Sequence, residues 1–355
     1  MKTNTDNLAG NNQDILFNSA KLSDTLSLKN RIVMAPMTRS MADDNLVPTA
    51  AMAEYYGRRA ATGLIVAEAT IISPLGQGYP NTPGLYSRAQ IDGWKKVTDK
   101  VHQNGGKIFA QIWHCGRVSH PIYLNGEKPV APSAVALNGR VPRTEELHYG
   151  MPREITAGEI KAVIQQFAQA AANAREAGFD GIELHAANGY LLDQFLHFET
   201  NQRSDAWGGS VENMTRILFD VIDAVKQTID HVSVRLSPSA YLHIEHDPRD
   251  KDVFDYLLPR LNDYNLTYVH TGMFEDSHQE HLDATVTQYI RSHYKGTLIA
   301  NGGYDADSGR TALLKGDADL IAIGRPLIAN PDYVEKIRNN EVLIDFHNDH
   351  LNELV

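Results

Sequence analysis

The sequence predicts an α/β protein folded as a (β/α)₈ TIM barrel, and three observations support this. Short apolar runs alternate with amphipathic segments and give eight strand–helix pairs in strict order over about 300 residues, a typical barrel length. The apolar runs have no polar face, as in parallel strands buried on both sides. No repeat, low-complexity tract or linker divides the chain, so we expect a single domain over residues 1–355.

The elements are expected in the following order. The predicted strands are 31–36, 63–69, 107–112, 181–186, 232–236, 268–271, 297–300 and 320–323. The helices that follow them are 48–59, 88–103, 157–177, 210–228, 252–262, 281–293, 306–314 and 331–337. Residues 16–28 are expected to be short extended pieces packed against the body. A doubly wound sheet is the alternative, but Ala35-Pro36-Met37-Thr38 follows the first strand where that fold carries a glycine-rich turn.

One long interruption breaks the alternation after the third strand. Residues 113–156 carry prolines at 121, 129, 132, 142 and 152, which favours loop and hairpin structure. Loops of this length in a compact domain are usually functional. We therefore expect a lid or hairpin insertion at this point.

The composition is that of a soluble globular protein, with 42% apolar and 22% charged residues. A formal net charge of −11 argues against nucleic acid or an anionic membrane as a partner. No apolar run approaches the roughly 18 residues of a membrane span, and the N-terminus has no apolar signal core. We expect a cytoplasmic protein, a monomer or homodimer, that acts on small molecules.

The cysteine and histidine usage predicts no metal site. A single cysteine, Cys115, rules out an intramolecular disulfide, an iron–sulfur cluster and a Cys-type zinc site, and we expect it to be a small buried residue. Two histidine groups have the spacing of metal ligands, but the sequence places no further ligand beside either. They are His243, His246 and Asp247, and separately His278 and His281.

The stretch 181–190 contains the strongest candidates for catalytic residues. It begins as an apolar strand and ends in a turn bearing His185, Asn188 and Tyr190, which supply a switchable donor, an amide and a phenol. Polar side chains at the carboxyl ends of barrel strands form active sites. A capping turn beside a core histidine would give the same pattern. The other strand ends are needed to choose between these interpretations.

Glycine turns follow the seventh and eighth strands. Gly302-Gly303 and Gly324-Arg325 each open a helix, which is typical of the phosphate site of this fold, with Arg325 as the counter-ion. Ordinary tight turns are the alternative. Two such turns at adjacent strand ends, one followed by arginine, favour a phosphorylated ligand.

Two further polar residues lie in strands of otherwise apolar sequence. Gln111 offers an amide that can pair with a lactam or imide edge. Arg235 places a permanent cation in a buried strand, which is costly unless an anionic group faces it. A structural salt bridge to Glu183 or Glu68 is the alternative, and we expect Glu183 to be the partner of a strand-end cation.

Together these motifs resemble the old yellow enzyme family of ene-reductases. The similarity runs from about Leu26 to Asp332 in the family's order and spacing. The motifs that carry it are Ala35-Pro36-Met37-Thr38-Arg39, Glu68-Ala69-Thr70, Gln111-Ile112-Trp113-His114, His185-Ala186-Ala187-Asn188-Gly189-Tyr190, Asn201-Gln202-Arg203-Ser204-Asp205 and Ala329-Asn330-Pro331-Asp332.

The resemblance implies FMN in the barrel mouth and NADPH or NADH as the hydride donor. It implies that the isoalloxazine is bound by Pro36, Met37, Thr38, Ala69, Gln111 and Arg235, and the phosphate by Gly303, Gly324 and Arg325. The substrate would be an electron-poor alkene, such as an α,β-unsaturated aldehyde, ketone or imide or a nitroalkene. Its carbonyl would be bound by His185 and Asn188, its α-carbon protonated by Tyr190, and its pocket lined by Tyr79 and Trp113.

The chain departs from the family pattern in two places. Thr38 and the His185/Asn188 pair resemble the classical branch, but residues 344–355 lack that branch's tyrosine-rich pattern and 271–275 lack its usual tryptophan. The walls of the substrate pocket are therefore not predicted.

Two functions of other classes remain open. A non-flavin barrel enzyme would need a Schiff-base lysine or a carboxylate base at a strand end, and none stands out. A catalytically idle flavin-binding protein would not need to keep His185, Asn188 and Tyr190 together.

Overall fold

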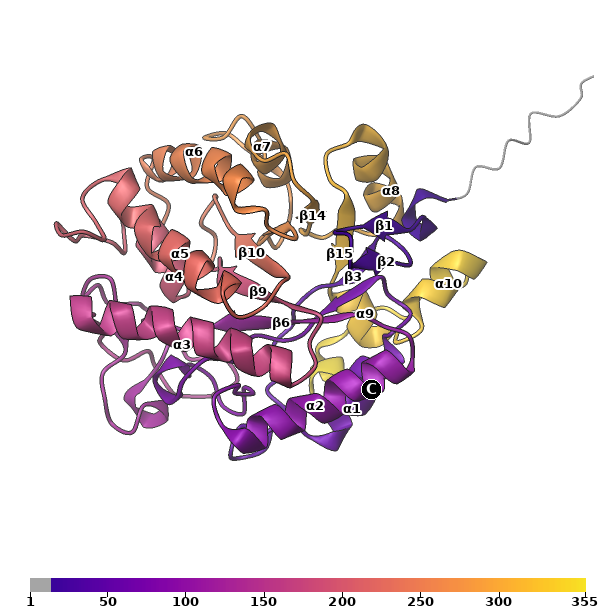
Figure 1. The fold of residues 1–355 in the computed structure, drawn as a ribbon, viewed down its shortest axis with the longest axis horizontal. Helices are drawn as coiled ribbons and strands as arrows, with labels where there is room; N and C mark the ends of the chain where they lie inside the picture. Colours follow the sequence, from indigo (N-terminus) through magenta and orange to yellow (C-terminus); the bar gives the residue numbers. More distant parts are fainter. Residues whose placement is uncertain (1–13) are drawn as a thin grey trace, which may run out of the picture.

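The computed structural model describes residues 14–355, which form a closed parallel barrel ringed by helices (Figure 1). Each strand pairs in parallel with the next, and the last pairs with the first, which closes the ring and confirms the predicted TIM barrel. The barrel strands are β3 (Ile32–Met34), β4 (Leu64–Val66), β6 (Ile108–Trp113), β9 (Gly181–Ala186), β10 (Val232–Leu236), β11 (Val269–Thr271), β14 (Leu298–Ala300) and β15 (Leu320–Ile323). A short strand, β5 (Thr70–Ile71), pairs with the end of β6.

The predicted helices are present with small shifts at their ends. Ser87 and Thr156 each form a reciprocal capping box, with Gln90 and Glu159, and so define where α2 and α3 begin. The helices are α1 (Ala50–Arg58), α2 (Arg88–Gln103), α3 (Ala157–Glu176), α4 (Leu191–Leu196), α5 (Val211–Lys226), α6 (Asp250–Arg260), α7 (Val286–His293), α8 (Ala306–Lys315), α9 (Arg325–Ala329) and α10 (Tyr333–Asn339). Within residues 14–355, no helix has the length and apolar character needed to cross a bilayer.

The helix predicted over 281–293 is wrong in its first part. His278–Gln279 (β12) and Ala284–Thr285 (β13) form an antiparallel hairpin, whose turn contains Asp283 at φ 51°. The side chain of Thr285 accepts the first free N–H of α7, from Gln288, so the helix begins only after it. The helix predicted over 331–337 is likewise preceded by a separate short helix, α9, and the two are divided at 330–332.

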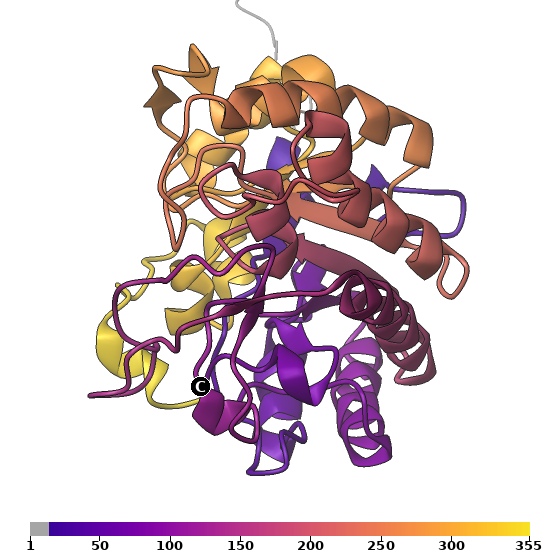
Figure 2. The same ribbon diagram turned by 90° about the vertical axis from the view of Figure 1, so that its left-hand side faces the viewer.

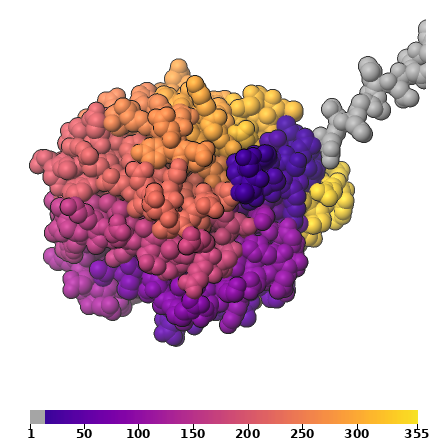
Figure 3. Space-filling view, in the orientation of Figure 1, coloured from indigo at the N-terminus to yellow at the C-terminus, as the bar shows by residue number. Residues whose placement is uncertain are grey.

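The interior of the barrel changes from apolar to polar along the strands. Phe109 of β6 and Leu320 of β15 lie in an apolar cluster that includes Leu26 and Leu28 of the N-terminal hairpin. This hairpin, β1 (Ala20–Lys21) and β2 (Ser27–Leu28), confirms the expected extended pieces and closes one end of the barrel. Figure 3 faces this end and shows the indigo segment packed among its neighbours. Ligands must therefore reach the interior from the opposite end.

The insertion predicted at 113–156 begins one residue later, because Trp113 is the last residue of β6. Within it, β7 (Val130–Ala131) and β8 (Arg153–Glu154) pair in parallel, and an antiparallel bridge joins Arg140 to His148. In Figure 2 the insertion and the C-terminal segment lie at the end of the barrel opposite the N-terminal hairpin. The insertion is thus at the open mouth.

The apolar end layer should contribute strongly to stability. Leu320 is fully buried inside the barrel, whereas Leu314 on α8 is 75% exposed. We expect Leu320→Ala to lower the free energy of unfolding by about 2–5 kcal/mol. The matched Leu314→Ala change should alter it by no more than about 0.5 kcal/mol. Urea unfolding of both variants measures the difference, and equal losses would contradict the assignment of Leu320 to the core.

Candidate active site

The turn after β9 presents the polar side chains predicted from the sequence. Asn188 and Gly189 both have left-handed backbones, at φ 61° and 78°. A Cβ on Gly189 would lie 2.5 Å from the carbonyl oxygen of Leu242, so only glycine fits there. The turn is held by two bonds to its backbone: Gly189 N–H donates to Asp193 Oδ2 (2.8 Å), and Asn188 N–H donates to Ser237 Oγ (2.8 Å).

An aromatic cluster brings His185, Tyr190, Tyr79 and Trp113 together. The Trp113 ring is stacked on the His185 ring with centroids 5.8 Å apart, and it meets the Tyr190 ring edge-on at 4.4 Å. Trp113 is fully buried, so it lies behind these two side chains and fixes their orientation. The hydroxyl oxygens of Tyr79 and Tyr190 are 2.5 Å apart. Tyr190 therefore has a second phenol as its hydrogen-bond partner.

Burial sets the protonation of this cluster. It raises the pKa of Tyr190 above its usual range and that of Tyr79 likewise, so both are neutral hydroxyls at physiological pH. Burial, with the nearby charge of Arg235, lowers the pKa of His185 well below its usual value. Its Nδ1 is buried and has no partner within residues 14–355. An orphaned nitrogen of this kind suits a ligand that completes its hydrogen bonding.

The side-chain amide nitrogen of Asn188 already donates two hydrogen bonds within the protein. Its Nδ2 donates to the hydroxyl of Tyr241 (2.5 Å) and to the carbonyl oxygen of Gly272 (2.9 Å). An amide has two N–H donors, so a ligand carbonyl can reach Asn188 only by taking the place of Tyr241. Tyr241, in the loop after β10, is 40% exposed and was not among the predicted site residues.

A polar layer lies above the apolar one inside the barrel. The Gln111 amide donates to Glu183 Oε1 (2.7 Å), and His270 Nδ1 lies 2.8 Å from Glu183 Oε2. All three side chains are buried. One amide hydrogen of Gln111 is thus used inside the protein.

The alternative interpretation of Arg235, a salt bridge to Glu183 or Glu68, does not hold, because neither bridge is present among residues 14–355. Arg235 donates instead to neutral oxygens, the Thr271 carbonyl (3.3 Å) and Asn301 Oδ1 (2.8 Å). Strand register is the reason, because Glu183 lies opposite Gln111, two residues before the level of Arg235. A buried cation with only neutral partners fits a ligand edge that carries negative charge.

The glycine turns after β14 and β15 present free backbone donors. The N–H groups of Gly303, Gly324 and Arg325 have no backbone acceptor within the described residues. The Arg325 guanidinium is exposed and lies over the ring of Phe274, 4.5 Å from its centroid. Free N–H groups after two neighbouring strands, beside an arginine, fit a phosphate.

The loop after β3 lies at the same mouth. Pro36, Met37 and Thr38 are half-buried, and Arg143 of the insertion reaches the carbonyl oxygen of Thr38 (3.4 Å). Ala69, after β4, is buried in the cluster that contains Tyr190 and Trp113. All the predicted cofactor residues thus lie at strand ends on one side of the barrel.

Residues 15–343 match the model of the NADH:flavin oxidoreductase / NADH oxidase family. The chain belongs to this family. It is an NAD(P)H-dependent flavin oxidoreductase with FMN as its cofactor, and the resemblance to old yellow enzymes is confirmed. The donors described above fit FMN: free N–H groups for its phosphate, and for its ring a guanidinium whose hydrogen-bond partners are neutral oxygens.

Individual relatives agree with this family. 12-Oxophytodienoate reductase 7 of Oryza sativa subsp. japonica is 41% identical over 340 residues, which cover 88% of this chain and 85% of the relative. A probable flavin mononucleotide-dependent alkene reductase of Leishmania infantum is 40% identical over 320 residues, covering 87% and 86%.

Two solved structures are also similar. Morphinone reductase in complex with tetrahydroNAD gives a TM-score of 0.87 at 40% identity, covering 95% of this chain and 93% of that one. The old yellow enzyme homologue from Zymomonas mobilis gives 0.89 at 37% identity, covering 95% and 96%.

In this flavin oxidoreductase the atypical C-terminal segment packs beside the loop after β3. The guanidinium of Arg39 is buried, and its Nη2 donates to the carbonyl oxygens of His350 (2.8 Å) and Glu353 (2.6 Å). The side chain of Asn330 makes two bonds to the backbone of Ile344 (2.9 and 2.8 Å). The segment is therefore anchored at both ends.

Residues 14–355 contain no cluster of three or more His, Cys, Asp or Glu side chains that could bind a metal ion. The rings of His246 and His281 lie 4.2 Å apart without further ligands. Cys115 is buried, and burial raises the pKa of its thiol well above the usual value, which makes it unreactive.

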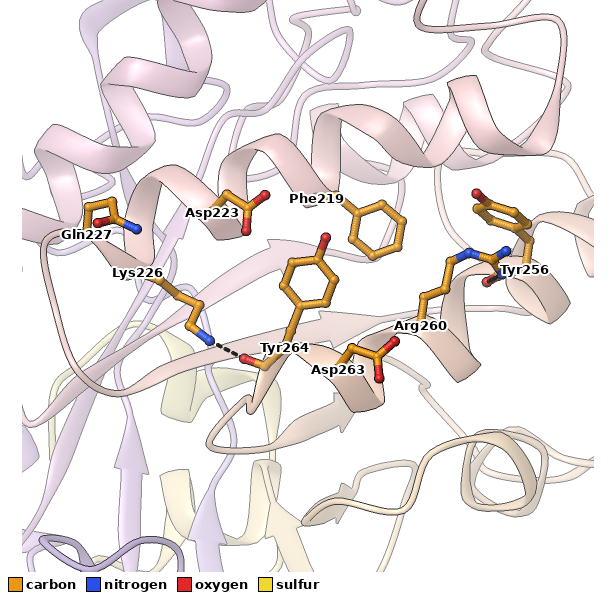
Figure 4. Close-up of a pocket in the computed structure, with 8 residues that line it drawn as sticks. All are labelled: Phe219, Asp223, Lys226, Gln227, Tyr256, Arg260, Asp263 and Tyr264. Carbon is orange, nitrogen blue, oxygen red and sulfur yellow. Dashed lines mark hydrogen bonds between the residues drawn. The ribbon is translucent and has the colours of Figure 1, made fainter.

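A surface pocket of about 580 Å³ lies away from these residues, between α5 and the segment 256–264 (Figure 4). Phe219 and Tyr264 stack in it, and Lys226 donates to the Tyr264 carbonyl oxygen. The pocket is at the end of α5 that leads into the start of β10, whereas the candidate site is at the carboxyl ends of the strands. It is not part of the flavin site.

The carboxyl of Glu68 should make stability depend on pH. Glu68 accepts hydrogen bonds from the backbone N–H of Arg39 (3.0 Å), that of Ser40 (3.3 Å) and the hydroxyl of Tyr56 (3.1 Å). Burial nevertheless raises the pKa of Glu68 to about 7. Between its unfolded value and pH 7 the folded protein keeps a proton that the unfolded chain loses, so stability falls as the pH rises.

We expect Glu68→Gln to remove roughly 3 kcal/mol of pH dependence between pH 4.5 and 7, because the amide stays neutral. Urea unfolding at pH 4.5, 6 and 8 measures the difference from the parent protein. Glu127→Gln, at an exposed carboxyl, is the control. Parallel pH profiles for the parent and Glu68→Gln would show that Glu68 is already ionised when folded.

Proposed function

We propose that this flavin oxidoreductase is an ene-reductase that reduces the C=C bond of electron-poor alkenes, namely α,β-unsaturated aldehydes, ketones and imides and nitroalkenes. The observation that supports this best is the pairing of a neutral His185 ring, whose Nδ1 has no partner in residues 14–355, with the protonated phenol of Tyr190 beside it. A hydrogen-bond donor and a proton donor on one side of a flavin are what conjugate reduction needs. The net charge of −11 argues against nucleic acid or an anionic membrane as a partner, and we expect a cytoplasmic monomer or homodimer that acts on a small molecule.

The proposed cofactor contacts follow the strand ends. Pro36, Met37, Thr38 and Ala69 would border the isoalloxazine, with Gln111 and Arg235 at its polar edge. Gly303, Gly324 and Arg325 would bind the phosphate. When bound, FMN supplies the hydride that it has received from NADPH or NADH.

His185 would polarise the substrate. A neutral imidazole carries one N–H, which donates to the carbonyl or nitro oxygen and draws electron density away from the β-carbon. The Asn188 amide joins it by exchanging its bond to Tyr241 for one to the same oxygen. Fixed donors at a developing negative charge typically contribute about 10²–10³ in rate.

Tyr190 would deliver the proton. As the β-carbon accepts hydride, the C=C π bond breaks, the Tyr190 O–H bond breaks, and the α-carbon takes that proton. The product therefore gains one hydride and one proton. The phenolate left behind is buried, which is costly, and the hydroxyl of Tyr79 at 2.5 Å stabilises it by donating a hydrogen bond until a proton returns.

The insertion would act as the lid. Val141 is buried in the cluster that contains Tyr190 and Trp113, and Arg143 contacts the loop of Thr38. Covering the mouth from this side excludes water from the reacting carbons.

The function is tested on the purified protein. We expect a yellow solution with flavin absorption, bleaching by NADPH under nitrogen, and recovery of the colour when 2-cyclohexen-1-one is added. A colourless protein that takes up no FMN would refute the flavin assignment. If NADPH bleaches the flavin but no enone or nitroalkene of a panel restores its colour, the protein is a flavoprotein that does not reduce electron-poor alkenes.

Tyr190→Phe separates the proton donor from the rest of the site. We expect reoxidation by 2-cyclohexen-1-one to slow by about 10²–10⁴, the usual contribution of a general acid. Reduction by NADPH should change by no more than about threefold, because it needs no phenolic proton. Stopped-flow spectroscopy follows both half-reactions. Tyr264→Phe, in the pocket of Figure 4, is the matched control, and equal slowing of both half-reactions in Tyr190→Phe would count against this role.

A further inference from the structure

A buried chain of ionisable groups, which the proposed reaction does not use, lies behind the turn after β9. His197 follows α4 and is completely buried. Its Nε2 lies 3.2 Å from Asp193 Oδ1 and its Nδ1 lies 2.8 Å from Asp250 Oδ2. Asp250 is the first residue of α6 and is also buried. One imidazole thus joins two carboxylates from different segments.

The geometry requires a charged imidazole. A neutral ring has one N–H and one lone pair, so it could donate to only one of the two carboxylates and would turn a lone pair toward the other. An imidazolium donates to both. Burial alone would lower the pKa of His197, but the carboxylates of Asp193 and Asp250 outweigh it and raise the pKa to about 10.

The second oxygen of the Asp193 carboxylate bonds to the turn after β9. Oδ2 accepts the backbone N–H of Gly189 (2.8 Å) and the hydroxyl of Ser237 (3.0 Å). The Ser237 oxygen in turn accepts the backbone N–H of Asn188 (2.8 Å). The carboxylate therefore joins the cation on one side to the left-handed turn on the other.

Asp250 anchors the other end. Its Oδ1 accepts the backbone N–H of Phe198 (2.8 Å), and its Oδ2 accepts that of Asp247 (3.3 Å) as well as the His197 ring. These bonds fix the cation relative to α6. Without the cation, Asp193 would be a buried carboxylate with no positive partner, and its hold on the turn would weaken.

We propose that His197 is a positioning residue. Asp250 holds the imidazolium of His197, and the imidazolium fixes the carboxylate of Asp193. That carboxylate in turn holds the backbone of residues 188–190. That backbone sets where the amide of Asn188 and the phenol of Tyr190 point relative to His185. Misplacing a reacting group by about 1 Å can cost about 10²-fold in rate. The inference rests on the proposed function only for its kinetic consequence, and its structural content stands on the contacts alone.

The first test needs neither FMN nor activity. Amide hydrogen–deuterium exchange is measured on the flavin-free protein for the parent, His197→Gln and a control. The control is His102→Gln, since His102 is also paired with a carboxylate, Asp180 at 2.8 Å, but on α2. We expect exchange of the Asn188 and Gly189 amides to rise by at least about tenfold in His197→Gln only. Unchanged exchange at these two amides would overturn the proposal.

The second test uses the FMN-loaded protein. In His197→Gln we expect reoxidation by 2-cyclohexen-1-one to slow by at least about tenfold, whereas reoxidation by dioxygen, which needs neither donor, stays within about twofold. The dissociation constant of FMN should also stay within about twofold. If both reoxidation rates and the affinity for FMN fell by the same factor, His197 would have a general role in folding, and the proposal would be overturned.

Asp250→Asn is the second variant, for the case in which His197→Gln does not fold. It removes one of the two anions that hold the cation while keeping an acceptor for Phe198, so we expect the same pattern with a smaller amplitude. Parent-like exchange at Asn188 and Gly189 in this variant would contradict the inference. If the parent protein reduces no alkene, the proposed function fails, and the exchange experiment still decides whether His197 positions the turn.

Discussion

The candidate site is organised around the guanidinium of Arg235, a cation held inside the barrel. Its hydrogen-bond partners in the protein are two neutral groups, a carbonyl oxygen and an amide oxygen. The layer below it contains the buried carboxyl of Glu183, which is bonded to Gln111 and His270. No carboxylate of residues 14–355 accepts a hydrogen bond from Arg235, so its guanidinium can face a ligand in the mouth, and we propose that this ligand is the flavin.

The turns around that cation are held by buried acids. Glu68, after β4, accepts two backbone N–H groups of the loop after β3. Asp193 accepts the backbone N–H of Gly189 in the turn after β9, and Asp250 accepts that of Phe198, the residue that follows His197. In each case a carboxylate supplies an acceptor to backbone groups that no strand or helix satisfies. The positions of the reactive side chains thus depend on polar contacts as much as on apolar packing.

Much of the barrel was predictable because parallel strands buried on both faces leave uninterrupted apolar runs. Gln111, His185 and Arg235 were identified as candidates because they are polar residues at the carboxyl ends of apolar strands, where barrel sites are built. The start of α7 was missed because its apolar periodicity continues back through a hairpin, and only the cap formed by Thr285 and Gln288 marks the boundary.

Contacts between loops could not be predicted from the sequence pattern. Tyr241 reaches Asn188 from a segment whose path no periodicity fixes. The spacing of four between Asp193 and His197 suggests a pair on one helix face, but nothing in the sequence indicates that Asp250, 53 residues from His197, completes it. The alternative salt bridge of Arg235 could not be excluded from the sequence, because register, which sets the layer of each inward residue, is decided by the whole barrel.

The C-terminal segment has a practical consequence for handling the protein. Two main-chain oxygens in its last six residues are the acceptors of a guanidinium next to the cofactor loop. Trimming those residues would remove both acceptors from that buried guanidinium and loosen the loop after β3 from outside the barrel. An affinity tag or a surface linkage is therefore better placed at the amino end, since the hairpin of β1 and β2 lies on the far side of the barrel from the mouth.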